Sequence, residues 1–155
     1  MIIGCQEMPS EIGPLEAALP VGCTVYRAAT ESGCITGFIY SETLAASFAN
    51  VGNQLKPELL TYLEGKGVDK KIRETTVRRM CVGSFQIPGK GRVLVLVFHC
   101  KSFKNLVAVQ ADFVGHALTR AAAVFGCVAY GAGDMNTEAK WPKGTTVATQ
   151  REAVM

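Results

Sequence analysis

A run of six apolar residues, Val93 to Phe98, constrains the fold of this 155-residue chain more than any other feature. It reads V-L-V-L-V-F, so an extended chain would carry no polar side chain on either face. Such a strand needs cover on both faces, which predicts a central strand of a sheet. The turn signal Pro88-Gly89-Lys90-Gly91 precedes it and predicts a hairpin, whose first strand, residues 74–87, alternates imperfectly like an edge or bulged strand.

The remaining sequence predicts a second hairpin and several helices. Residues 23–29 and 34–40 are rich in β-branched and aromatic residues and flank a turn that contains Gly33, which predicts two paired strands. Apolar residues recur at helical spacing in two longer stretches. The expected helices are residues 11–19 with Ser10 as N-cap, residues 42–55 with Ser41 as N-cap, residues 57–64, and residues 105–125, in which Val124 lies on the apolar stripe, Gln110 lies on the polar side and Gly126 ends the helix.

This order of elements (helix, hairpin, helix, hairpin, helix) predicts an α+β fold, with helices packed on an antiparallel sheet. The length and the hydrophobic content of 48% are those of one globular domain. We expect residues 1–130 to form this single domain. Residues 131–155 contain glycines, Pro142 and only scattered apolar side chains, which predicts a loosely ordered C-terminal arm.

Nothing in the sequence predicts a membrane or secretory segment. The six-residue run at Val93 is far shorter than the roughly 18 residues that span a bilayer. The first residues, Met1 to Cys5, lack a basic region and are soon followed by Glu7, unlike a signal peptide. We therefore expect a cytoplasmic protein.

Cysteine spacing and glycine-rich turns give no sign of a metal or cofactor. None of the six cysteines belongs to a C-x-x-C pair, and no glycine-rich segment has the form of a phosphate-binding loop. We expect reduced, mostly buried thiols, no metal and no cofactor. The cysteines are Cys5, Cys23, Cys34, Cys81, Cys100 and Cys127.

Positive charge is concentrated in one segment. Residues 66–104 contain ten basic and two acidic residues, a net charge of +8, whereas the rest of the chain sums to −5. Pairing of strand 74–87 with the strand after the turn would gather these cations on one surface. It would bind an acidic protein, a nucleic acid or an anionic membrane surface, although a merely solvated basic face is the alternative. The expected partner-binding residues are Lys70, Lys71, Arg78, Arg79, Lys90 and Arg92.

A small set of polar residues could carry chemistry. Asp112 and His116 are four residues apart on a predicted helix, with Arg120 one turn further, so a carboxylate could orient the imidazole. Cys100 would then need His116 as its base, because the adjacent His99 points to the opposite face of the strand. The catalytic candidates are thus Cys100, His116 and Asp112, and the alternative is a surface ladder of charged side chains.

The chain resembles a known family in the order of its elements. The hairpin around residues 29–33, the stripe of residues 42–55, the strand Val93 to Phe98 and the helix that opens at Asn105-Leu106 are similar to the roadblock family of dynein light chains and small-GTPase regulators, and more loosely to profilin. The likeness covers about residues 11–125. It implies a dimer that joins sheets and pairs helices and serves as a scaffold or GTPase-regulating platform. The basic second hairpin and the C-terminal extension depart from the family.

Three function classes follow from these features. The leading prediction is a non-enzymatic regulatory or scaffold subunit that binds a protein partner, such as a small GTPase, as a dimer. The first alternative is a small cytosolic enzyme with a Cys/His/Asp site. The second is a nucleic-acid-binding protein that uses the basic segment, residues 70–104.

Overall fold

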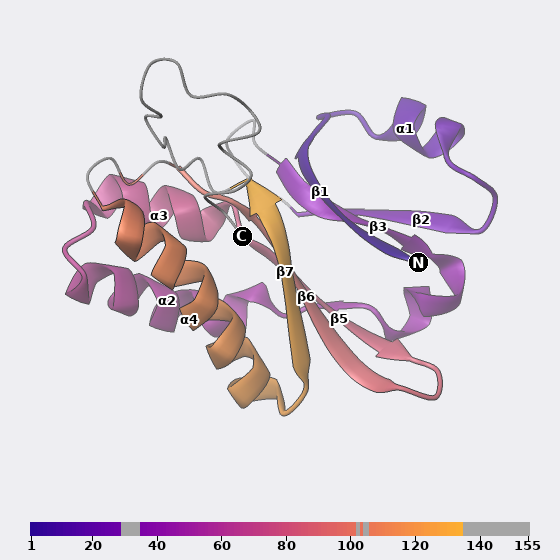
Figure 1. Ribbon diagram of the computed structural model, residues 1–155. Helices are drawn as coiled ribbons and strands as arrows, with labels where there is room; N and C mark the ends of the chain where they lie inside the picture. Colours follow the sequence, from indigo (N-terminus) through magenta and orange to yellow (C-terminus); the bar gives the residue numbers. More distant parts are fainter. Residues whose placement is uncertain (29–34, 102, 104–105, 135–155) are drawn as a thin grey trace, which may run out of the picture.

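The computed structural model describes residues 1–28, 35–101, 103 and 106–134, apart from the side chain of Val107. Its helices and two sheets form an α+β fold, as predicted. A three-stranded sheet packs on one face of a four-stranded sheet, and three helices cover the other face (Figure 1). No helix in the described part of the chain is both long and apolar enough to cross a membrane.

The four-stranded sheet contains the predicted central strand. Strand β6 (Gly91–His99) lies between β5 (Cys81–Ile87) and β7 (Val128–Asp134), and the two-residue β4 (Ala49–Asn50) lies beyond β5. β5 and β6 are antiparallel and joined by the predicted turn. β7 instead runs parallel to β6, because it returns after a helix. The sheet is therefore mixed and not wholly antiparallel.

The three-stranded sheet contains the predicted first hairpin. Its order is β1-β3-β2, with β2 (Cys23–Arg27) and β3 (Ile35–Ser41) antiparallel as expected. The predicted turn between these strands lies outside the described residues. β1 (Ile2–Met8) was not predicted; it pairs with β3, and a register shift interrupts the ladder between Cys5 and Met8. Helix α1 (Gly13–Ala18) begins after Ile12, and Ser10 is not its cap.

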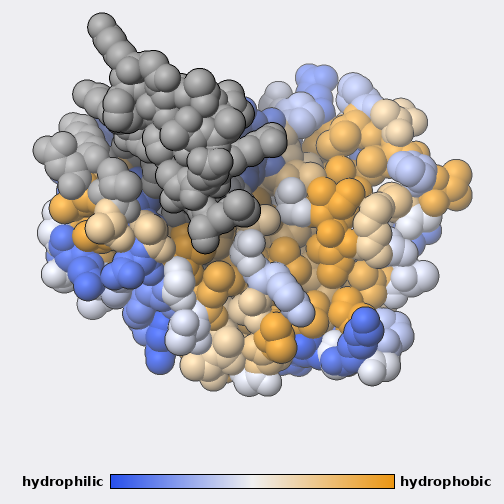
Figure 2. All heavy atoms as spheres, in the orientation of Figure 1, coloured by the Kyte–Doolittle hydropathy of each residue, from blue (hydrophilic) through white to orange (hydrophobic). Residues whose placement is uncertain are grey.

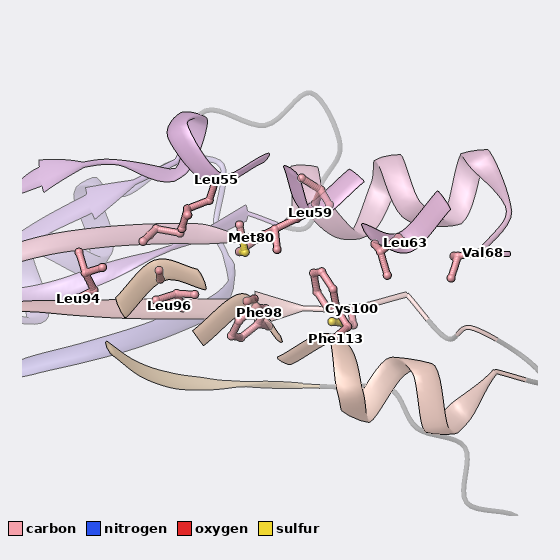
Figure 3. Close-up of a cluster of buried hydrophobic side chains, with 14 of the residues drawn as sticks. Leu55, Leu59, Leu63, Val68, Met80, Leu94, Leu96, Phe98, Cys100 and Phe113 are labelled. Atoms are coloured by element: carbon pink, nitrogen blue, oxygen red, sulfur yellow. The ribbon is translucent and has the colours of Figure 1, made fainter. Parts of the chain in front are cut away.

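Helices α2 (Gly52–Gly65), α3 (Lys70–Arg78) and α4 (Val107–Phe125) enclose the first core cluster against the four-stranded sheet. Leucines of α2 and Phe113 of α4 point toward the β6 side chains Leu94, Leu96 and Phe98 (Figure 3). The second cluster fills the space between the two sheets. Its centre is Phe85, whose ring centroid lies 5.6 Å from that of Phe38 and 5.3 Å from that of Tyr40. β6 thus has the helices on one face and the three-stranded sheet on the other, although Val93 and Val95 are only partly buried.

The predicted strand at residues 74–87 is wrong in its first half. Residues 70–78 form helix α3, and the strand begins only at Cys81. The Asp69 side chain caps this helix by accepting hydrogen bonds from the backbone N–H groups of Lys71 and Ile72 at 3.0 and 3.2 Å. A capped helix start and the burial of Thr76 and Val77 outweigh the β propensity of this threonine- and valine-containing stretch.

The predicted helix at residues 42–55 is also wrong. Residues Glu42–Ser47 form a 3-10 helix (η1), which is followed by β4, and α2 starts at Gly52. Phe48 thereby turns into the aromatic cluster between the sheets, with its ring centroid 5.2 Å from that of Phe85. Pro57, expected to begin a separate helix, lies inside α2, where it removes one backbone donor without ending the helix.

Helix α4 was predicted closely, but two of its side chains were placed on the wrong face. Gln110, expected on the polar side, is fully buried, and Val124, expected on the apolar stripe, is 47% exposed. Gly126 ends the helix at a φ of 61°, as predicted. Residues 131–134 belong to β7 and are not part of a loose arm, and residues 135–155 lie outside the described part of the chain.

Candidate functional site

Cys100, the predicted nucleophile, lies in the interior. Its side chain is 1% exposed and belongs to the cluster beneath the helices (Figure 3). Desolvation, together with a smaller effect of the negative charge of Asp134, raises the pKa of the thiol from 9.0 to about 12. A nucleophilic cysteine needs the opposite shift, because the thiolate is the reactive species.

The other two catalytic candidates, Asp112 and His116, belong to α4. Asp112 is exposed to solvent, whereas the His116 ring stacks on Tyr62 of α2, with centroids 3.8 Å apart and planes 9° apart. Arg120 pairs with Glu58 of α2, at 2.5 Å between Nε and Oε1. The side chains of His116 and Arg120 therefore join α4 to α2. Cys100 is buried and Asp112 is exposed, and neither of the two pockets described below is lined by Cys100, Asp112 or His116.

The predicted basic surface is divided between two ends of the molecule. Lys70, Lys71 and Arg78 belong to α3, and Arg79 is its C-cap. Lys90 lies in the β5–β6 turn and Arg92 near the start of β6. Because Cys81 pairs with Val97 and Ile87 pairs with Gly91, the α3 cations adjoin one end of the β5–β6 ladder and the turn cations the other. The pairing expected to gather all six does not occur, since residues 78 and 79 are not in the strand.

Each group of cations borders a surface pocket. Lys90 and Arg92 line a shallow pocket of about 570 Å³ together with Phe125, Cys127 and Val128, beside the first residue of β7. Lys71 and Lys101 line a second pocket of about 400 Å³ near the start of α3. Both pockets carry positive charge at their walls, which suits anionic groups.

Several buried polar atoms have no hydrogen-bond partner among the described residues. His99 is 6% exposed; its Nε2 lies 3.8 Å from Glu7 Oε1, and its Nδ1 has no hydrogen-bond partner. Thr36 Oγ1 and Arg79 Nε are also buried without a partner. Glu7 has a φ of 51°, a left-handed conformation that is rare outside glycine. No sequence pattern predicts this group, because β1 reaches the end of β6 only through the packing of the two sheets on each other.

The most extensive feature missed by sequence reasoning is the open edge of the four-stranded sheet. β7 is the last strand of that sheet, and within the described residues no strand pairs with its outer edge. Val128 and Tyr130 are 57% and 59% exposed, and they continue a row of apolar side chains from Val93 and Val95 of β6, their neighbours in the ladder. We call these four residues and the outer edge of β7 the edge surface. Figure 2 shows apolar side chains gathered on this face of the molecule.

The described cysteines and acidic residues do not form a metal centre. Among the described residues, no group of three histidine, cysteine, aspartate or glutamate side chains could hold a metal ion. Cys81 and Cys100 are buried as expected, whereas Cys23 is only partly buried. Cys34 lies outside the described residues.

Comparison with known proteins gave no match to a protein-family model, a curated protein or a solved structure.

Proposed function

We propose that this protein is a non-enzymatic scaffold subunit that works as a homodimer, joined through the edge surface, and presents the cations of α3 to an acidic protein partner. The observation that carries this proposal is the exposed β7 edge, with Val128 and Tyr130 beside it. The resemblance to the roadblock family supports the same class of protein, since it implies a dimeric scaffold that serves small GTPases.

The composition of β7 favours pairing with another strand. Proteins protect the free edges of sheets with lysine, proline, bulges or very short strands. β7 is seven residues long, reads V-A-Y-G-A-G-D, and contains neither lysine nor proline. An edge of this length and composition associates with another strand unless something covers it.

A second copy of the same chain fits this edge in an antiparallel arrangement. A two-fold axis at Gly131 places Val128 of one copy opposite Asp134 of the other, as the isologous contact of a dimer requires. The Asp134 carboxylate would then approach the pocket where Lys90 and Arg92 lie beside Val128. The charges of this arrangement are complementary, and the two Asp134 carboxylates lie at opposite ends of the interface.

The oligomeric state tests the proposal. Sedimentation or light scattering at micromolar concentration should give twice the chain mass of 16.6 kDa. Tyr130→Lys places a charge in the interface and should yield monomers. Val21→Lys is the control, because Val21 is also an exposed apolar residue but precedes β2, away from β7. A monomeric wild-type protein, or a dimer that survives Tyr130→Lys, would contradict the proposal.

A further inference from the structure

The pocket beside the start of α3 is built from two connections that are far apart in the sequence. Gly67, Val68 and Asp69 come from the α2–α3 connection, and Lys101, Phe103 and Leu106 come from the segment between β6 and α4. Lys71 and Ile72 of α3 complete the wall. Its volume of about 400 Å³ falls within the range of roughly 300–1,000 Å³ that small-molecule sites occupy.

The floor of this pocket is apolar and belongs to the core. Val68, Ile72 and Phe103 are each at least nine-tenths buried and are members of the cluster beneath the helices. Figure 3 shows Val68 at the end of this cluster, on the side of the α2–α3 connection. Because these side chains are fixed by packing on the core, the pocket does not depend on a ligand for its shape.

A buried glutamine holds the opposite wall in place. Gln110 of α4 is fully buried; its Oε1 accepts a hydrogen bond from Phe103 N at 3.1 Å, and its Nε2 donates to Lys101 O at 3.4 Å. Leu106 N donates to Phe103 O at 3.1 Å. These bonds fix the backbone on which Lys101 and Phe103 are carried, which explains why a polar side chain is buried on this face of α4.

The charges around the pocket leave two ammonium groups for a ligand. The Asp69 carboxylate is engaged as the cap of α3. Outside the pocket, Lys70 Nζ lies 3.9 Å from Glu74 Oε1, and Arg73 Nη2 lies 2.6 Å from Glu64 Oε1. In the described part of the chain, no acidic side chain pairs with Lys71 or Lys101, the two cations that line the pocket.

We infer that this pocket binds a small organic anion with an apolar body, whose carboxylate or phosphate group contacts Lys71 and Lys101 while its hydrocarbon part lies on Val68, Ile72 and Phe103. An anion without an apolar part would leave the floor uncovered. A neutral molecule of the same shape would lose both charge-assisted hydrogen bonds. The site therefore selects for the two features together, and it is independent of the β7 edge.

Titration of the full-length protein with hexanoate, hexanamide and inorganic phosphate tests this inference. Hexanoate carries both features, and we expect it to bind at least about tenfold more tightly than either of the other two probes. Hexanamide loses the hydrogen bonds to a charged group, and inorganic phosphate loses the burial of the hydrocarbon chain. In ¹H–¹⁵N spectra the amide signals of Val68, Ile72 and Leu106 should shift with the same saturation curve. Absence of saturable hexanoate binding, or shifts confined to other residues, would overturn the inference.

Charge-removing variants separate specific binding from general attraction to a basic protein. Lys71→Gln and Lys101→Gln should each weaken hexanoate binding by roughly threefold to tenfold. Lys70→Gln is the matched control, because Lys70 is adjacent in sequence and equally charged but is not part of the pocket wall. All three lysines are exposed, so the variants should remain folded. Equal affinity in the double Lys71→Gln/Lys101→Gln variant and the wild type would refute the site.

Discussion

The two buried thiols should make the fold sensitive to alkaline pH. Burial raises the pKa of Cys81 and of Cys100 from 9.0 to about 12. Between these values the unfolded chain has lost its thiol protons and the folded chain has kept them, so stability falls as pH rises. At pH 10.5 the loss is about 2 kcal/mol for each thiol relative to pH 8, or about 4 kcal/mol together. This is a large part of a typical unfolding free energy of roughly 5–15 kcal/mol.

Urea unfolding under reducing conditions at several pH values measures this loss directly. The variant Cys81→Ala/Cys100→Ala should unfold more easily at pH 8, because two small cavities remain, but should lose little further stability up to pH 10.5. The unfolding free energy of this variant should still fall slightly with rising pH, because desolvation also raises the pKa of Tyr26 and of Tyr40 above 10.0. A wild-type stability that is flat over this range, or an equal fall in the variant, would show that the thiols are not desolvated in this way.

Alkylation of the thiols discriminates the scaffold from the enzyme alternative. In the folded protein at pH 8, iodoacetamide should modify the partly exposed Cys23 and leave Cys100 intact until urea unfolds the chain. Rapid modification of Cys100 in the native state would favour the nucleophile that the sequence allowed.

Further substitutions test the packing that positions the candidate sites. Gly4→Ala should destabilise the fold by about 1–3 kcal/mol in urea unfolding, because its Cβ would lie 2.6 Å from Val97 Cγ2; Gly115→Ala, with open space around it inside α4, should instead stabilise by up to about 1 kcal/mol. Gln110→Ala should cost about 1–3 kcal/mol, because it leaves buried backbone groups without partners, and a neutral effect would contradict its role. A double-mutant cycle on Arg120 and Glu58 should give under about 1 kcal/mol, weakened by added salt, since both side chains are 41% exposed.

The parts of the fold that were predictable carry strong local signals. The six apolar residues of β6 identify a strand with two covered faces, and Gly126 marks the end of α4 through a φ that other residues avoid. α3 was missed because Thr75, Thr76 and Val77 have β propensity, while the signal that decides the matter is the cap at Asp69. Asp69 followed by a helix-forming turn at residues 70–73 is the sequence pattern that predicts this helix.

The candidate sites were harder to predict because they depend on topology. The sequence shows where cations occur but not that a helix separates Arg79 from the strand that pairs with β6. Gln110 is expected on the polar side because a glutamine is usually exposed, although it lies four residues after Leu106 and three before Phe113, on the apolar stripe itself. The segment that it holds explains why a polar side chain is buried there.

The open edge follows from how the chain returns after α4. A strand that follows a crossover helix lies parallel to its predecessor, so β7 is added at the side of β6 that β5 does not occupy. β1 covers the resulting face at one end only: Gly4 lies against Val97, which is fully buried, whereas Val95 and Val93 are partly exposed. Val128 and Tyr130 of β7 thus continue the row of Val93 and Val95 on this face, and both are exposed to solvent. If a second copy pairs with the outer edge of β7, the sheet continues beyond Val128 and Tyr130, and Tyr130→Lys should leave that edge unpaired as well as separate the copies.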